Sequence, residues 1–113
     1  MVGGGRMGGQ IARGDVRLYQ FKAPDKLRPA VVLTRDSSLA VLSTVTIAPI
    51  TSTIRGVPSE VILNEEDGMK NTCAINLHNT LTVSQGSLGK RVAQLSPARI
   101  EQLCFALRYA MGC

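Results

Sequence analysis

Two short segments place arginines and hydroxyl groups at the ends of apolar runs, where a folded chain can hold them rigidly. In the first, the basic loop at residues 22–29, Arg28 stands two residues before the apolar run 30–34. An arginine at the start of a buried strand can present its planar guanidinium group to a phosphate. The second segment, residues 48–56, leads from an apolar run into three hydroxyl side chains and Arg55. Because hydroxyls and arginines bind phosphate oxygens, both segments are candidates for phosphate chemistry.

Several of these polar groups also have a purely structural explanation. Thr51, Ser52 and Thr53 can satisfy the backbone groups of a turn, and taken alone their types favour that role. The acidic turn Glu65-Glu66-Asp67 is typical of a solvated charge cluster rather than of a metal site. Cys104 is more typical of a small core residue than of a catalytic nucleophile, because no histidine is near it in the sequence.

The positive charge of the chain is concentrated in its first third. The formal net charge is +5, and residues 1–35 hold seven lysines and arginines against two aspartates. Residues 36–113 hold six basic and six acidic residues, so the whole excess lies in the first 35. Such a concentration suggests an anionic partner, either a nucleic acid or an acidic protein segment. Ordinary solubilising charge explains the composition equally well.

Composition excludes several other classes of protein. The chain has 113 residues, and its odd number of cysteines, three, favours a reducing cytoplasm over a disulfide framework. It has a single histidine, His78, which leaves too few ligands for a cysteine–histidine zinc site. No apolar run reaches about 18 residues, so no membrane span is expected. The first residues lack the apolar region of a signal peptide. No Walker A, HExxH or GxSxG motif occurs. We therefore expect a cytoplasmic protein with no metal or cofactor.

The elements that must position these residues are mainly β-strands. We expect a disordered glycine-rich tail at residues 1–12 and one domain at 13–113. Short runs separated by turns predict strands at residues 16–21, 30–34, 39–50, 60–63, 73–83 and 88–95, with Pro49 ending regular pairing in the third. This order is typical of an antiparallel, coiled small barrel.

A single C-terminal helix is expected to follow the strands. Ser96 is a suitable N-cap, Pro97 suits the first helical position, and Gly112 suits the position just past the end. Residues of one apolar face recur at helical spacing between these caps: Ile100, Leu103, Cys104, Leu107 and Met111.

The order of several motifs resembles the MazF/PemK/Kid toxin family. Those motifs are Arg13-Gly14-Asp15-Val16, Arg28-Pro29-Ala30-Val31-Val32-Leu33, Ala48-Pro49-Ile50-Thr51-Ser52, the segment 55–63, and Cys73-Ala74-Ile75-Asn76-Leu77 with Thr82-Val83 and Leu88-Gly89. The helix after Ser96 fits as well. The resemblance covers residues 13–111, and its specificity lies in the order and spacing of motifs that are individually weak.

This resemblance implies a fold and an activity. The fold is an SH3-like β-barrel of the CcdB/Kid/MazF type with a C-terminal helix, forming a homodimer and binding a cognate antitoxin. The activity is sequence-specific, ribosome-independent endoribonuclease cleavage of single-stranded RNA (mRNA, rRNA or tRNA) without a metal. The ribose 2′-hydroxyl attacks the adjacent phosphate and leaves a 2′,3′-cyclic phosphate and a 5′-hydroxyl end. Arg28 matches the family's catalytic arginine, and Thr51 matches the threonine that contacts the phosphate.

The chain departs from the family at the groups that move protons. The loop before Arg28 is shortened, so Ala23 stands where the family usually has glutamate, and Asp25 is the nearest carboxylate. His78-Asn79 replaces an Asp-Gln pair whose aspartate is the proposed base in the Kid branch. Histidine keeps acid–base capacity near neutral pH, but a solvent-facing histidine at a strand end fits the sequence equally well. The sequence leaves open whether His78, Asp25 or neither takes the proton. The expected substrate-binding residues are Lys22, Lys26, Ser52, Thr53, Arg55 and Asn79.

Two other functions fit the same barrel. A CcdB-type toxin poisons DNA gyrase without cutting RNA, and a basic barrel can bind RNA without catalysis, since fold alone does not determine function. Retention of Arg28 and Thr51 favours RNA cleavage over both.

Overall fold

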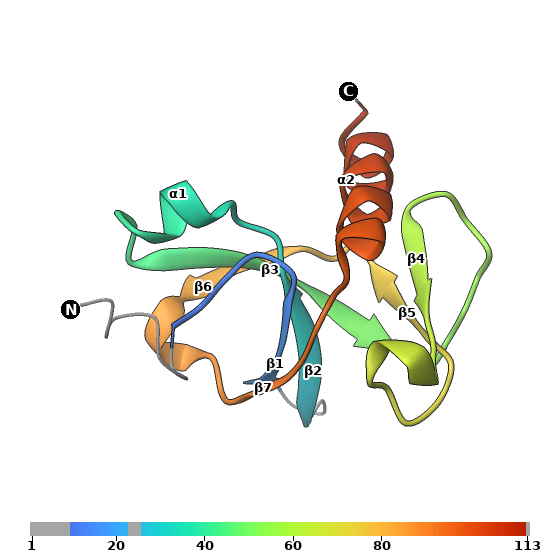
Figure 1. Cartoon of the computed structure of the whole chain (residues 1–113), viewed down its shortest axis with the longest axis horizontal. Helices are drawn as coiled ribbons and strands as arrows, with labels where there is room; N and C mark the ends of the chain where they lie inside the picture. Colours follow the sequence, from blue (N-terminus) through green and yellow to red (C-terminus); the bar gives the residue numbers. More distant parts are fainter. Residues whose placement is uncertain (1–9, 23–25, 113) are drawn as a thin grey trace.

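A curled antiparallel sheet with one long helix at its end forms the structure, a computed structural model that describes residues 10–22 and 26–112 (Figure 1). Within these residues the chain forms β1 (Asp15–Gln20), β2 (Leu27–Val32), α1 (Asp36–Leu39), β3 (Thr44–Thr51), β4 (Glu60–Leu63), η1 (Glu65–Asp67), β5 (Cys73–Asn76), β6 (Leu81–Ser84), η2 (Gln85–Ser87), β7 (Arg91–Gln94) and α2 (Pro97–Met111). The strand order is β4-β5-β3-β2-β1-β7, and β6 also pairs with β3. The prediction of a small coiled β-structure with a C-terminal helix is therefore confirmed.

Both faces of the central strands are buried, as the continuous apolar run at 30–34 predicts. Val31 and Val32 are fully buried, yet they belong to two separate hydrophobic clusters on opposite faces of the sheet. The larger cluster includes Leu103 of α2, and the smaller one includes Val45 and Ile47 of β3. Burying one such side chain stabilises the fold by about 1.5–3 kcal/mol. This two-sided core holds β2 and β3 in a single register.

The predicted strand at 73–83 is wrong as one element, because a loop divides it into β5 and β6. Ile50 of β3 pairs with Ile75, whereas Ile47 pairs with Leu81, so three steps along β3 correspond to six on the other strand. The loop at residues 77–80 contains these three additional residues, and we call it the β5–β6 bulge. Bulges of this kind redirect side chains out of a sheet.

The third predicted strand is also corrected at both ends. The predicted start at Leu39 is wrong because Asp36–Leu39 forms α1, and Val41 in the turn that follows is 81% exposed. The prediction that Pro49 ends pairing is wrong as well, since β3 continues to Thr51. The Thr46 carbonyl accepts a hydrogen bond from the Leu33 amide, so the backbone groups of even-numbered β3 residues point toward β2. The backbone groups of odd-numbered residues point toward β5 and β6 on the other side. The missing N–H of Pro49 therefore falls at the β5–β6 interruption, where the ladder offers it no partner.

The last predicted strand is shorter than expected. Instead of residues 88–95, β7 covers Arg91–Gln94, after the 3-10 turn η2. Lys90 accepts a hydrogen bond from the amide of Leu18 through its carbonyl, so the chain follows β1 before β7 begins.

The caps of α2 agree with the sequence prediction, but its apolar face is shifted. The Ser96 side chain accepts a hydrogen bond from the Arg99 amide, and Gly112 ends the helix with φ +76°. Leu103 and Ala106 are buried, whereas Met111, predicted for the core face, is 65% exposed. The helix extends past the sheet in Figure 1, so its last turn has no strand beneath it.

The predicted tail and the membrane question have separate outcomes. Residues 1–9 of the tail predicted at 1–12 lie outside the described residues, while Ile11 packs against the smaller hydrophobic cluster and the Ala12 amide donates to Asp15. In the described part of the chain, no helix has the length and apolar character needed to cross a membrane.

Candidate functional site

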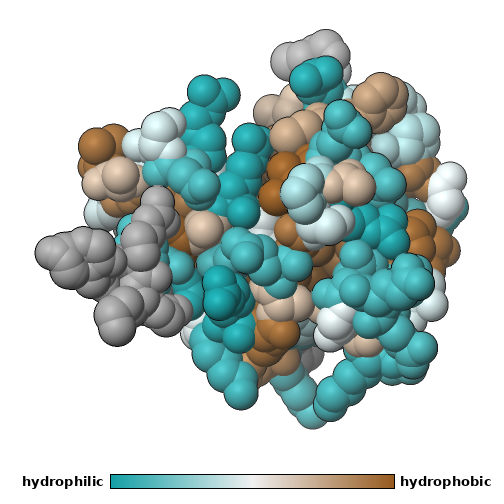
Figure 2. All heavy atoms as spheres, in the orientation of Figure 1, coloured by the Kyte–Doolittle hydropathy of each residue, from teal (hydrophilic) through white to brown (hydrophobic). Residues whose placement is uncertain are grey.

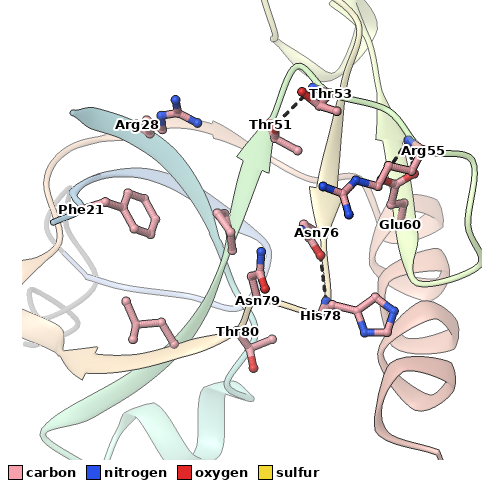
Figure 3. Close-up of a pocket in the computed structure, with 12 residues that line it drawn as sticks. Phe21, Arg28, Thr51, Thr53, Arg55, Glu60, Asn76, His78, Asn79 and Thr80 are labelled. Atoms are coloured by element: carbon pink, nitrogen blue, oxygen red, sulfur yellow. Dashed lines mark hydrogen bonds between the residues drawn. The ribbon is translucent and has the colours of Figure 1, made fainter. Parts of the chain in front are cut away.

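A cavity of about 560 Å³ opens where the end of β3, the exposed end of β2 and the β5–β6 bulge meet (Figure 3). We call it the front cavity. Its lining comes from seven separate segments of the chain: Phe21, Arg28, Pro49 with Thr51, Thr53 with Arg55, Glu60, Asn76, and His78 to Leu81. The sheet thus gathers residues that are up to 60 positions apart in the sequence.

Arg28 of β2 and Thr51 of β3 both line the front cavity. The last residue pair of the β2–β3 ladder is Ala30 with Pro49, and Arg28 and Thr51 each lie two residues beyond it on their strands. Side chains two residues apart on a strand point to the same face, so Arg28 and Thr51 lie on the face of Ala30 and Pro49. A guanidinium and a hydroxyl group therefore share the rim of the front cavity, where they can bind one phosphate together.

The Thr51 hydroxyl combines the structural role and the binding role that the sequence left as alternatives. Its Oγ1 accepts a hydrogen bond of 3.1 Å from the Thr53 amide, as a turn-capping hydroxyl does. A hydroxyl that accepts one bond still has its own proton to donate. Thr51 can therefore shape the turn and donate to a phosphate oxygen at the same time.

The loop after β3 is held by Glu60. The Gly56 amide donates to Glu60 Oε1 at 2.9 Å, and the Arg55 amide donates to both carboxylate oxygens at 3.2 Å. Gly56 has φ +74°, a left-handed conformation that favours glycine. Figure 3 shows the Arg55 guanidinium turned inward on the side of Asn76. The carboxylate thus fixes the backbone from which this second guanidinium enters the cavity.

His78 and Asn79 reach the cavity because of the β5–β6 bulge. The His78 amide donates to Asn76 Oδ1 at 2.9 Å, which turns the chain out of the ladder just after β5. Both side chains are exposed and line the front cavity. In Figure 3 the His78 ring lies on the wall opposite Arg28 and points away from it.

The remaining predicted site residues fall elsewhere. Ser52 does not line the front cavity but a neighbouring one, which also contains Arg28 and Thr51. Lys22 and Lys26 are exposed and line neither cavity. Asp25 lies outside the described residues.

Sequence reasoning missed three polar contributors to the front cavity, Glu60, Asn76 and Thr80. The one sequence signal for Glu60 is its position four residues after Gly56, whose amide donates a hydrogen bond to its carboxylate. The lining contains two arginines, Arg28 and Arg55, and one carboxylate, Glu60. The Glu60 carboxylate already accepts hydrogen bonds from backbone amides. The cavity therefore favours an anion. Among residues 10–22 and 26–112, no three histidine, cysteine, aspartate or glutamate side chains gather as a metal site.

Comparisons with known proteins give one consistent result. A sequence model of the family described as "PemK-like, MazF-like toxin of type II toxin-antitoxin system" matches residues 12–111. The chain is 39% identical over 103 residues to a probable endoribonuclease MazF5 of Mycobacterium tuberculosis, covering 90% of this chain and 94% of the relative. It is 36% identical over 97 residues to a probable endoribonuclease MazF2 of the same species, covering 85% and 95%.

Solved structures show the same likeness. The Mycobacterium tuberculosis toxin MazF-mt6 superposes with a TM-score of 0.78 at 31% identity, covering 87% of this chain and 96% of that one. A mycobacterial endoribonuclease in complex with its cognate antitoxin has the same fold, with a TM-score of 0.78 at 21% identity over 91% and 96% of the two chains.

Proposed function

Because the chain belongs to the PemK-like, MazF-like toxin family of type II toxin–antitoxin systems, we propose that its front cavity cleaves single-stranded RNA. The observation that carries this proposal is that Arg28 and Thr51, each two residues beyond the last β2–β3 pair, share the rim of an anion-favouring cavity. The family resemblance and the endoribonuclease class predicted from the sequence are confirmed by the comparisons. The roles of individual residues below are proposals.

The reaction begins with attack of a ribose 2′-oxygen on the adjacent phosphorus. The bond to the 5′-oxygen breaks, which leaves a 2′,3′-cyclic phosphate and a 5′-hydroxyl end. Negative charge builds up on the phosphoryl oxygens in the transition state, and fixed cationic and hydroxyl donors stabilise it. Arg28 and Thr51 are the donors at the rim, and Arg55 adds a second guanidinium from the cavity wall.

Two protons must move, one from the 2′-hydroxyl and one to the 5′-oxygen. His78 lines the front cavity and carries an imidazole, the side chain that most often transfers protons in enzyme active sites. We assign it the proton transfer. Its ring has to turn inward when RNA binds, and an exposed side chain changes rotamer within nanoseconds. Catalytic contacts commonly tighten only in the complex with substrate.

RNA cleavage in EDTA tests the proposal. Purified protein is incubated with a defined single-stranded RNA, and the ends are mapped chemically. We expect cyclic phosphate and 5′-hydroxyl ends, and we expect Arg28→Ala to lower kcat/KM by about 100- to 1,000-fold, the usual effect of removing one transition-state donor. Arg108→Ala, at an exposed arginine on α2, is the matched control. Wild-type cleavage by Arg28→Ala contradicts the site assignment.

The partners follow from the same family. We infer that the protein is a cytoplasmic homodimer and that it binds a cognate antitoxin. The mycobacterial endoribonuclease in complex with its cognate antitoxin supports the second of these partners. Phe105 and Tyr109 expose aromatic surface on α2, which is suited to burial against another chain. Both relatives described above are named as endoribonucleases, so gyrase poisoning and RNA binding without catalysis are not favoured.

A further inference from the structure

A second cavity lies behind the Arg28–Thr51 rim. We call it the rear cavity; its volume is about 660 Å³. It is lined by Leu18, Arg28, Pro29, Ile50, Thr51, Ser52, Gly68 to Cys73, Lys90 and Val92. Pro29 and Ile50 alternate with Arg28 and Thr51 along β2 and β3, so they point to the opposite face of the sheet. The two cavities therefore occupy opposite faces and share the rim as their boundary.

The charge of the rear cavity is of one sign. Its lining contains Arg28, Lys70 and Lys90 and no aspartate or glutamate among the described residues. The two lysines come from separate segments, one after η1 and one before β7. Figure 2 shows hydrophilic residues over η1 and the loop that follows it, at the lower right of that face; those of η1, Glu65 to Asp67, are acidic and do not line the rear cavity. A cavity whose charged lining residues are all cationic suits a polyanion. The fold brings its two lysines together from segments that are far apart in the sequence.

The floor of the rear cavity is apolar. Ile50 and Cys73 are buried there, and Met69 packs against the larger hydrophobic cluster. Asn71 and Thr72 are exposed and bring an amide and a hydroxyl group to the same lining. An apolar surface for the face of a ring, together with a few donors and acceptors at its edge, is how proteins bind an unstacked base of single-stranded RNA.

From these observations we propose that the rear cavity binds the nucleobase on one side of the scissile phosphate. This inference rests on the proposed function, because the shared rim is where that phosphate binds. Met69 and Val92 contact the face of the base, and Asn71 and Thr72 read its edge. Lys70 and Lys90 bind the phosphates that flank this nucleotide. The RNA strand crosses the rim, and one neighbour of the cut enters each cavity. The rear cavity is thus a determinant of the cleaved sequence.

Cleavage of an RNA pool randomised around the cut tests this proposal. Asn71→Ala removes the amide, Val92→Phe fills the cavity, and Gln102→Ala, at an exposed amide of α2 that lines neither cavity, is the matched control. Thermal unfolding verifies that each variant is folded. Asn71→Ala should weaken base discrimination at one position next to the cut by about 5- to 150-fold, the usual range for a paired amide–base contact. Val92→Phe should change the preferred base at that same position, whereas Gln102→Ala should leave every base preference unchanged.

The outcomes separate the inference from the function on which it rests. If wild-type protein cuts the pool and both rear-cavity variants keep every base preference, the rear cavity is not a base site and the endoribonuclease proposal stands. If wild-type protein cuts no RNA, the proposed function fails and the inference fails with it. A change at a position that is not next to the cut also overturns the assignment.

Discussion

Removing the Glu60 carboxylate tests whether the backbone after β3 must be held for cleavage. The carboxylate accepts hydrogen bonds from the Arg55 and Gly56 amides, while the Glu60 backbone pairs with Asn76 in β4–β5. Glu60→Ala removes both acceptors and keeps the strand pairing. We therefore expect a loosened loop between β3 and β4 in an otherwise folded protein.

The size of the effect follows from the exposure of the two donors. A hydrogen bond to a charged group contributes about 1.5–3 kcal/mol when it is protected from water. Arg55 and Gly56 are both exposed, so water replaces much of what is lost. We expect roughly 1–2 kcal/mol for both bonds together, which is a factor of about 5–30 in the population of the ordered loop. Because Arg55 enters the front cavity from this loop, kcat/KM should fall by the same factor.

Steady-state cleavage of one RNA substrate, with thermal unfolding of each variant, measures this effect. Glu60→Gln keeps a neutral acceptor and should lose less activity than Glu60→Ala. Glu101→Ala, at an exposed glutamate of α2, is the matched control. Wild-type kcat/KM in Glu60→Ala would refute the reasoning. An equal loss in Glu60→Gln and Glu60→Ala, with a changed pH profile, would instead make Glu60 a proton-transfer group.

Three further predictions concern acid–base chemistry and the core. Burial raises the pKa of Asp67, but hydrogen bonds from Arg99 and a backbone amide and the Arg99 charge outweigh it, so the pKa lies below its ordinary 3.8. Its stabilisation is present above that ordinary value and lost as pH falls through the lowered pKa, so the Tm deficit of Asp67→Asn at pH 7 should vanish in acid. Leu103→Ala should cost about 2–5 kcal/mol in urea unfolding, whereas Phe105→Ala, at a residue 69% exposed, should change stability by about 0.5 kcal/mol or less. If His78 transfers the proton, His78→Ala should flatten the rise of kcat with pH, and an unchanged profile would remove it from the mechanism.

The strands that bury both faces were predictable, whereas the bulge between β5 and β6 was not. Residues 73–83 contain no glycine or proline, and their apolar and β-branched side chains are typical of one strand. The interruption depends on tertiary contacts: the Leu77 amide donates to the Ser59 carbonyl, and the Leu77 side chain is buried. The one local signal is Asn76, a residue type that starts turns by accepting a hydrogen bond two residues further on.

The front cavity shows the same division between local and long-range information. Arg28 and Thr51 could be selected because their motifs resemble a family. Glu60 could not, since its role exists only when the loop returns to β4 and brings the Arg55 amide to its carboxylate. Lys22 and Lys26 were selected by charge and proximity in sequence, but both lie outside the two cavities. The net charge thus suggested an anionic partner, but it could not identify which lysines and arginines line the cavities.

The position of the proposed phosphate site is a consequence of how the core fixes register. Arg28 and Thr51 share one face of the sheet only because Val31 pairs with Ala48 and Val32 with Ile47, and all four of these side chains are fully buried. A slip of one residue would turn Arg28 to the rear face and expose the core, so the register is strongly specified. The His78 side chain has no such constraint, because it is exposed and lies outside the ladder. A fold built this way can keep its proposed phosphate donors while the residue at the proposed proton-transfer position varies.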